Sequence, residues 1–131
     1  MIVLDASAVI ELLLRTSRGA RVTERIAPDT ETLHAPHLID LEVAQVLRRY
    51  ERLGDLTAET ARRALADFGE LRIERYRHDL LLPRIWELRS NATAYDAAYL
   101  ALAETLSAPL LTADARLASL PAHRARVEVL R

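Results

Sequence analysis

The sequence Ile2-Val3-Leu4-Asp5-Ala6-Ser7 near the start of the chain predicts the junction of a strand and a helix. Residues 2–4 form an apolar run without alternation, which is typical of a strand buried on both faces of a parallel sheet. The run ends at Asp5, and we expect Ser7 to cap a helix that continues to about Leu14. This junction favours an α/β fold.

The same alternation of short apolar runs and helical patterns continues along the chain. We expect further strands over 32–35, 71–76, 109–112 and 127–130, and further helices over 20–26, 38–53, 57–69, 80–89 and 93–106. Strands that alternate with helices indicate a mostly parallel sheet of four or five strands between two helical layers. We therefore predict a three-layer α/β/α sandwich, with residues 1–131 as one domain because a typical domain has roughly 150 residues.

Composition excludes several classes of protein. The chain has 18 basic residues, all of them Arg, against 19 acidic ones, and its net charge of −1 argues against nucleic-acid binding by bulk charge. The absence of Cys excludes disulfides and zinc–thiolate sites, and the absence of Lys excludes a Walker-type phosphate loop. No segment reaches the ~18 apolar residues of a membrane span, and the N-terminus lacks the basic start of a signal peptide, so we expect a cytoplasmic location.

Two acidic residues directly follow predicted strands. Asp5 ends the first strand, and Asp114 follows the strand over 109–112. In open α/β sheets, ligands bind outside the carboxyl ends of the strands. Taken alone, each acid is better explained by a structural role, as the cap of the following helix.

Two further acids lie at the margins of apolar helix faces. Glu42 borders the apolar arc of the 38–53 helix, and Asp96 lies at the edge of the apolar face of the 93–106 helix, with no neighbouring base in the sequence. An acid in the first turn of a helix is stabilised by the macrodipole, so neither is unusual alone. Four converging carboxylates repel one another, however, and a divalent metal removes that penalty. Oxygen-only ligands favour Mg²⁺ or Mn²⁺.

These four acids stand in motifs that resemble those of a known family. The motifs are Val3-Leu4-Asp5-Ala6-Ser7-Ala8, Glu42 with Val43-Ala44-Gln45-Val46-Leu47, the segment from Thr93 through Tyr95-Asp96-Ala97-Ala98-Tyr99 to Ala103, and Leu111-Thr112-Ala113-Asp114. Together they resemble the four acidic motifs of the PIN-domain ribonucleases, and more closely the VapC toxins of bacterial toxin–antitoxin pairs. The resemblance covers nearly the whole chain in length and motif order.

The resemblance implies a metal-dependent endoribonuclease that hydrolyses RNA phosphodiester bonds. By the same resemblance, Mg²⁺ or Mn²⁺ is held, directly or through water, by Asp5, Asp96 and Asp114, and Glu42 binds a metal-held water or a second metal. Ser7 and Thr112 match small polar positions that line the family's site, although helix capping and strand-end hydrogen bonding explain them equally well. Some members of the family carry a further acid just after the fourth motif, and this chain has none at Ala115, Leu117 or Ala118.

The resemblance also implies partners, namely an RNA substrate, a VapB-type antitoxin and a second copy of the chain in a homodimer. Because Lys is absent, contacts to RNA phosphates fall to Arg, and the stripe Arg48, Arg49 and Arg52 shares a helix with Glu42. A solvated helix face is the alternative explanation of that stripe.

The first helix carries more apolar residues than one buried stripe needs, which favours a partner surface. Trp86 is expected in the core or at an interface.

Three alternatives stay open at the level of sequence. The first is a PIN-domain nuclease of RNA processing without a toxin role, which a neighbouring antitoxin gene distinguishes. The second is a phosphoacceptor module of the receiver type, which the missing Lys opposes. The third is a catalytically silent binding module, which the presence of all four acids opposes. A metal-independent mechanism based on the four scattered His residues is also disfavoured, because no two have a convincing spacing.

Overall fold

The computed structural model describes residues 1–131 and contains one five-stranded sheet in which every neighbouring pair of strands is parallel. The strands are β1 (Ile2–Leu4), β2 (Leu33–Pro36), β3 (Ile73–Tyr76), β4 (Leu110–Thr112) and β5 (Val127–Val129). Their order in the sheet is β3-β2-β1-β4-β5. The chain therefore builds the sheet outward from β1 in one direction and from β4 in the other, and the direction of winding reverses between these two strands.

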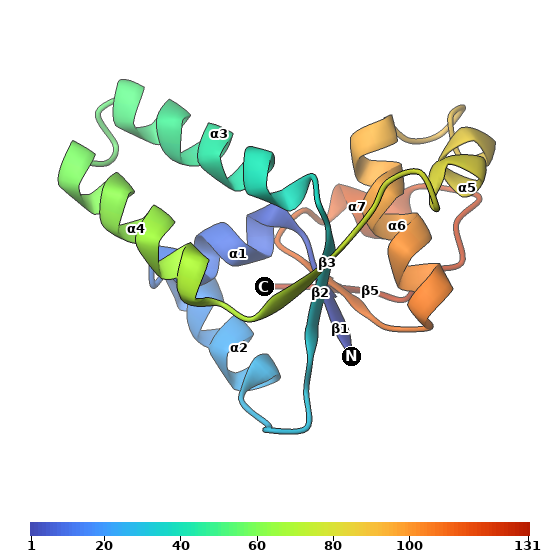
Figure 1. Cartoon of the computed structure of the whole chain (residues 1–131), viewed down its shortest axis with the longest axis horizontal. Helices are drawn as coiled ribbons and strands as arrows, with labels where there is room; N and C mark the ends of the chain where they lie inside the picture. The colour runs from blue at the N-terminus through green and yellow to red at the C-terminus, as the bar shows by residue number, and fades with distance from the viewer.

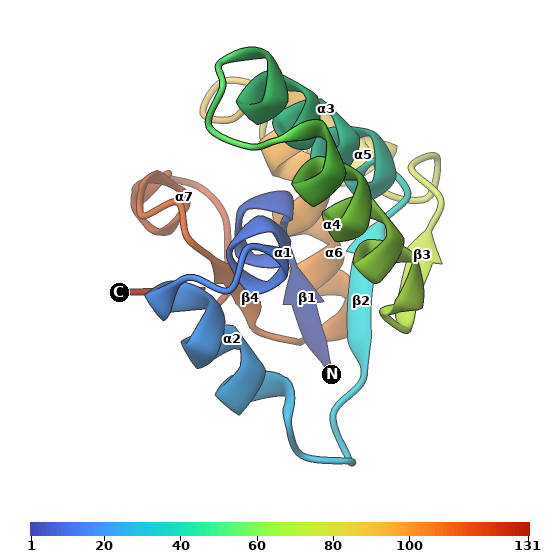
Figure 2. The ribbon, with the colours of Figure 1, turned by 90° about the vertical axis from the view of Figure 1, so that its left-hand side faces the viewer.

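Helices cover both faces of the sheet, as Figures 1 and 2 show. One layer holds α1 (Ala6–Leu13), α2 (Ser17–Ile26), α3 (Ile39–Arg52) and α4 (Ala58–Glu70), and the other holds α5 (Leu82–Glu87), α6 (Ala94–Leu106) and α7 (Arg116–Ser119). This arrangement confirms the predicted three-layer α/β/α sandwich. No helix is both long and apolar enough to cross a membrane.

The central strand β1 is buried on both faces, as its unbroken apolar run predicts. Ile2 and Leu4 pack into the core beneath α1, α3 and α4, whereas Val3 packs into the second core beneath α6. All three side chains are fully buried. Burying an aliphatic side chain of this size stabilises a fold by about 1.5–3 kcal/mol, so β1 anchors both helical layers.

Local capping corrects the predicted ends of two helices. The N-cap of α1 is Asp5, whose side chain accepts a hydrogen bond from the Ala8 backbone, so the prediction that Ser7 caps this helix is wrong. Helix α2 begins at Ser17 rather than near residue 20, because the Thr16 side chain caps it. The four-residue helix α7 was not predicted, since one turn is too short to show a periodicity.

The first helix is covered mainly by this chain itself. Leu12, Leu13 and Leu14 are partly buried and pack against the core that α1 shares with α2, α3 and α4. The approach of α2 is close, because a Cβ built on Gly19 would lie 2.1 Å from the backbone oxygen of Glu11. The predicted surplus of apolar surface on α1 is therefore largely used within the fold.

The α5 side of the molecule instead carries exposed apolar side chains. Trp86 on α5 is 67% exposed, so it does not lie in the core, and of its two predicted places the interface stays a prediction. Its ring lies 4.7 Å from the guanidinium carbon of Arg89. Leu80, Leu82 and Tyr95 are also more than half exposed on this side. We call these four side chains the α5 face: Leu80, Leu82, Trp86 and Tyr95.

Candidate functional site

Two predicted acids meet at the carboxyl ends of β1 and β4. The register pairs Leu4 with Leu111, so Asp5 follows β1 beside the last residue of β4, Thr112, and Asp114 comes two residues later. The winding of the sheet reverses between these two strands. Such a reversal opens a crevice at the strand ends, which is the usual ligand site of an open α/β sheet.

A hydroxyl network fixes the Asp5 carboxylate at this position. Oδ1 accepts hydrogen bonds from Ser7 Oγ at 2.7 Å and the Ala8 backbone N at 3.0 Å, and Oδ2 accepts one from Thr112 Oγ1. The same hydroxyls accept from the other strand end, since Ala113 N donates to Ser7 Oγ and Asp114 N donates to Thr112 Oγ1, each at 2.9 Å. Ser7 and Thr112 thus join the ends of β1 and β4 and orient Asp5.

Helices α3 and α6 supply the other two acids from their first turns. Glu42 lies in the first turn of α3, and Asp96 lies in that of α6, which Thr93 caps by accepting from the Asp96 backbone N at 3.1 Å. The Tyr99 hydroxyl, one turn after Asp96, donates to Glu42 Oε1 at 2.6 Å. This contact joins the two helices across the end of the sheet.

Burial and neighbouring negative charge raise the pKa values of two of the acids, Asp5 and Glu42. Burial raises the pKa of Asp5 from its ordinary 3.8 to about 6, and the charge of Glu42 adds to the rise, although the hydrogen bonds from Thr112, Ser7 and Ala8 oppose it. Burial also raises the pKa of Glu42, with a further contribution from the charge of Asp96. Because Asp5 responds to Glu42 and Glu42 to Asp96, these carboxylates form one electrostatic cluster.

Tyr99 was not identified as a site residue from the sequence. Burial, together with the neighbouring Glu42, raises the pKa of its hydroxyl well above the ordinary value. The phenol therefore stays protonated and acts only as a donor to Glu42. Its spacing of three residues from Asp96 was the available signal, because residues one turn apart share a helix face.

A cation from α7 completes the cluster. Arg116 Nη2 donates to Asp96 Oδ2 at 2.9 Å and to Asp114 Oδ2 at 3.0 Å, and its backbone N donates to Asp114 Oδ1 at 3.0 Å. These partners raise the pKa of the guanidinium. The expectation that Asp96 has no basic partner is therefore wrong, since Arg116 approaches from an element far along the chain.

The donor set has the chemistry of a site for a hard divalent cation. All of its candidate ligands are carboxylate oxygens, and no hydrogen bond reaches Asp96 Oδ1 or Glu42 Oε2. No three His, Cys, Asp or Glu side chains are positioned to share one ion in this geometry, in which Asp96 and Asp114 both contact Arg116. The chemistry of the donor set, four carboxylates, fits such an ion.

The predicted arginine stripe lies apart from the acids. Arg48, Arg49 and Arg52 are exposed on α3 and form no salt bridges. Arg49 is in line with Glu42 two turns farther along the helix, which is about 10 Å at 1.5 Å per residue. Arg48 lines a cavity of about 310 Å³ between α3 and α4.

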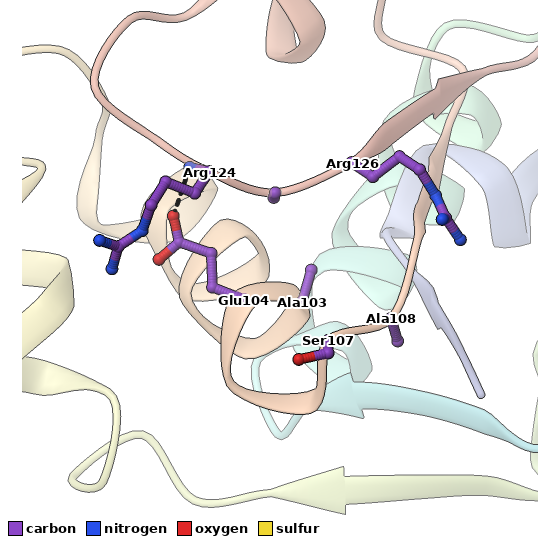
Figure 3. Close-up of a pocket in the computed structure, with 7 residues that line it drawn as sticks. Ala103, Glu104, Ser107, Ala108, Arg124 and Arg126 are labelled. Carbon is purple, nitrogen blue, oxygen red and sulfur yellow. Dashed lines mark hydrogen bonds between the residues drawn. The ribbon is translucent and has the colours of Figure 1, made fainter.

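A separate cavity of about 300 Å³ lies at the opposite end of the sheet, where α6 ends and β4 begins (Figure 3). Its one acid, Glu104, accepts from the Arg124 backbone N at 2.6 Å and from Arg84 Nε at 2.8 Å, so its charge is already paired. The four His residues also form no pair at the acids, and His34 is buried between Thr32 and Tyr76. Neither feature competes with the acidic cluster.

Comparison with known proteins identifies the family to which this chain belongs. A family model described as "PIN domain" matches residues 2–122, a range that includes all four acids. The chain belongs to the PIN-domain family. Among its PIN-domain relatives, ribonuclease VapC9 of Mycobacterium tuberculosis is 45% identical over 117 residues, covering 89% of this chain and 88% of the relative. Ribonuclease VapC1 of the same organism is 39% identical over 130 residues, covering 98% and 97%.

Solved structures agree with the PIN-domain fold. PAE2754 from Pyrobaculum aerophilum superposes with a TM-score of 0.69 at 25% identity, covering 98% of this chain and 83% of the other. VapBC2 from Rickettsia felis, solved with a DNA fragment of its promoter, gives a TM-score of 0.73 at 16% identity and covers both chains completely. At that identity the second likeness supports the fold alone.

Proposed function

We propose that this chain is a metal-dependent endoribonuclease, the toxin of a VapBC toxin–antitoxin pair. The observation that carries the proposal is the meeting of Asp5, Glu42, Asp96 and Asp114 at the reversal between β1 and β4. The relatives at 39–45% identity that are named VapC ribonucleases support the choice of RNA as substrate. The absence of Lys opposes the phosphoacceptor alternative.

In this proposal Asp5, Asp96 and Asp114 hold Mg²⁺ or Mn²⁺, and Glu42 orients a water or binds a second ion. When bound, the ion lowers the pKa of the attacking water and neutralises charge that develops on the phosphoryl oxygens. Ser7 and Thr112 keep the Asp5 carboxylate oriented by donating to both of its oxygens. This assigns them a positioning role rather than direct contact with RNA.

Contacts to the RNA backbone are assigned to arginines. Arg49, on the same side of α3 as Glu42, is the member of the stripe best placed to hold a phosphate near the acids, and Arg48 and Arg52 extend the positive charge outward. Exposed arginines without acidic partners keep their donors available, which favours this assignment.

We infer two partner surfaces, one from exposed and one from partly buried apolar side chains. We assign the homodimer contact to the α5 face, which borders a cavity of about 160 Å³ that is almost entirely apolar. We assign the VapB-type antitoxin to the groove of about 270 Å³ between α1 and α4, where Leu13, Leu14 and Leu56 lie beside Arg15 and Arg63. This lining suits an amphipathic helix with acidic residues at its edge. Loss of dimerisation in Trp86→Ala, measured by light scattering, would support the first assignment, and an unchanged dimer would remove it.

The test of the catalytic proposal is cleavage of total cellular RNA by the purified protein, freed of any bound partner. The arms are Mg²⁺, Mn²⁺, chelator, the Asp96→Asn variant with metal, and the Asp55→Asn variant with metal. Asp55 is an exposed loop acid away from the cluster and serves as the matched control. Discrete fragments that require metal and Asp96, but not Asp55, are the expected result. Intact RNA in every arm, from folded protein that binds Mn²⁺, would replace the proposal with a binding role.

A further inference from the structure

Arg116 stands out because a single nitrogen bridges two of the acids assigned to the metal. Nη2 lies 2.9 Å from Asp96 Oδ2 and 3.0 Å from Asp114 Oδ2. Its two hydrogens are thus directed to two carboxylates that come from different elements, α6 and the loop after β4. No other hydrogen bond or ion pair links Asp96 to Asp114, so the guanidinium holds the two acids together.

The two ion pairs of Arg116 form in this structure, but another cation can displace the guanidinium because the pairs are exposed. The Arg116 side chain is 57% exposed, so water competes for its donors. Exposed ion pairs contribute little to stability, since their Coulomb attraction is screened and the long side chain loses rotamer freedom. Because Arg116 is the first residue of α7 and Asp114 precedes that helix, the guanidinium can swing toward solvent while its backbone stays bonded to Asp114 Oδ1.

The position of the guanidinium conflicts with a bound metal. No three acidic side chains are positioned to share an ion in this geometry, in which Asp96 and Asp114 each give one carboxylate oxygen to Nη2. A divalent ion bound to these two carboxylates would lie a few ångströms from the guanidinium, and like charges at that distance repel strongly.

We propose that Arg116 is the internal counterion of the acidic cluster, which neutralises Asp96 and Asp114 in the metal-free protein and is displaced when the divalent ion binds. This inference rests on the proposed function, since it takes the same four acids as the metal site. Arg116 then lowers the apparent affinity for metal, because each binding event first breaks its two contacts. In the metal-free protein, Arg116 keeps the carboxylates of Asp96 and Asp114 close together.

The experiment is calorimetric titration of Mn²⁺ into RNA-free protein at low salt, comparing the wild-type chain with Arg116→Ala and Arg116→Gln. The control is Arg21→Ala, which removes an equal charge from an exposed arginine of α2 that has no ion pair. We expect both Arg116 variants to bind Mn²⁺ roughly three- to tenfold more tightly, the range that corresponds to releasing one or two exposed ion pairs, and Arg21→Ala to match the wild-type protein. The glutamine variant keeps most of the aliphatic stem, so it provides the measurement if the alanine variant does not fold.

The outcomes separate this inference from the proposed function. Mn²⁺ binding that is unchanged or weaker in the Arg116 variants would overturn the counterion role and would leave the metal site in place. A wild-type protein that binds no Mn²⁺ would overturn the proposed function as well. A purely structural role for Arg116 would lower the thermal stability of the variants but would not tighten their binding of Mn²⁺.

Discussion

Replacing Asp5 with Asn is expected to stabilise the metal-free protein at neutral pH. Burial raises the folded-state pKa of Asp5 from 3.8 to about 6, so the folded chain holds this proton more tightly than the unfolded chain does. Ionising Asp5 therefore costs folding free energy as the pH rises. The cost is absent below about pH 4 and complete above about pH 6. At about 1.4 kcal/mol per pKa unit, the rise corresponds to about 3 kcal/mol.

Asparagine avoids this cost because it carries no charge, while its Oδ1 keeps the hydrogen bonds from Ser7 and Ala8 and its amide faces Thr112. Imperfect amide geometry reduces the expected gain to about 2 kcal/mol. The assay is urea unfolding in chelator at about pH 4 and about pH 7.5. Asp5→Asn should unfold at a higher urea concentration than the wild-type protein at the higher pH, and at nearly the same concentration at the lower pH. A variant that is less stable than the wild-type protein at both pH values would refute the reasoning.

Three further changes test other parts of the account. Tyr99→Phe removes the donor to the half-buried Glu42 and should lower the free energy of unfolding by about 1–2 kcal/mol in thermal melts; wild-type stability would mean that water replaces the phenol. Gly19→Ala places a Cβ against the backbone of Glu11 and should cost about 1–3 kcal/mol in urea unfolding, and a neutral effect would show that α2 can move away from α1. Arg49→Ala should reduce the slope of log affinity for RNA against log salt by about 1, whereas an unchanged slope would exclude Arg49 from the RNA path.

The sheet and the acids at its strand ends were predictable because short stretches of sequence indicate them. The unbroken apolar run of β1 indicated burial on both faces, and the acid that follows each of β1 and β4 indicated the carboxyl edge of a parallel sheet. The order of the strands then brings Asp5 and Asp114 together. Capping was less predictable, since Asp5, Ser7 and Thr16 all have side chains that cap helices and only the backbone geometry selects among them.

The contacts between distant elements could not be read from the sequence. Arg116 reaches Asp96 from α7, a one-turn helix without a periodic pattern, and Tyr99 on α6 reaches Glu42 in the first turn of α3. The sequence also could not decide between the core and an interface for Trp86, and its exposure excludes the core. Pairings of this kind depend on tertiary packing, which spacing along the chain does not encode.

The central claim is that the four acids hold a divalent ion, and a crystal structure of the protein grown with Mn²⁺ tests it most directly. Anomalous scattering should locate the ion against carboxylate oxygens of Asp5, Asp96 and Asp114, with the Arg116 guanidinium moved away from Asp96. An ion located elsewhere, with Arg116 still bridging Asp96 and Asp114, would contradict the account.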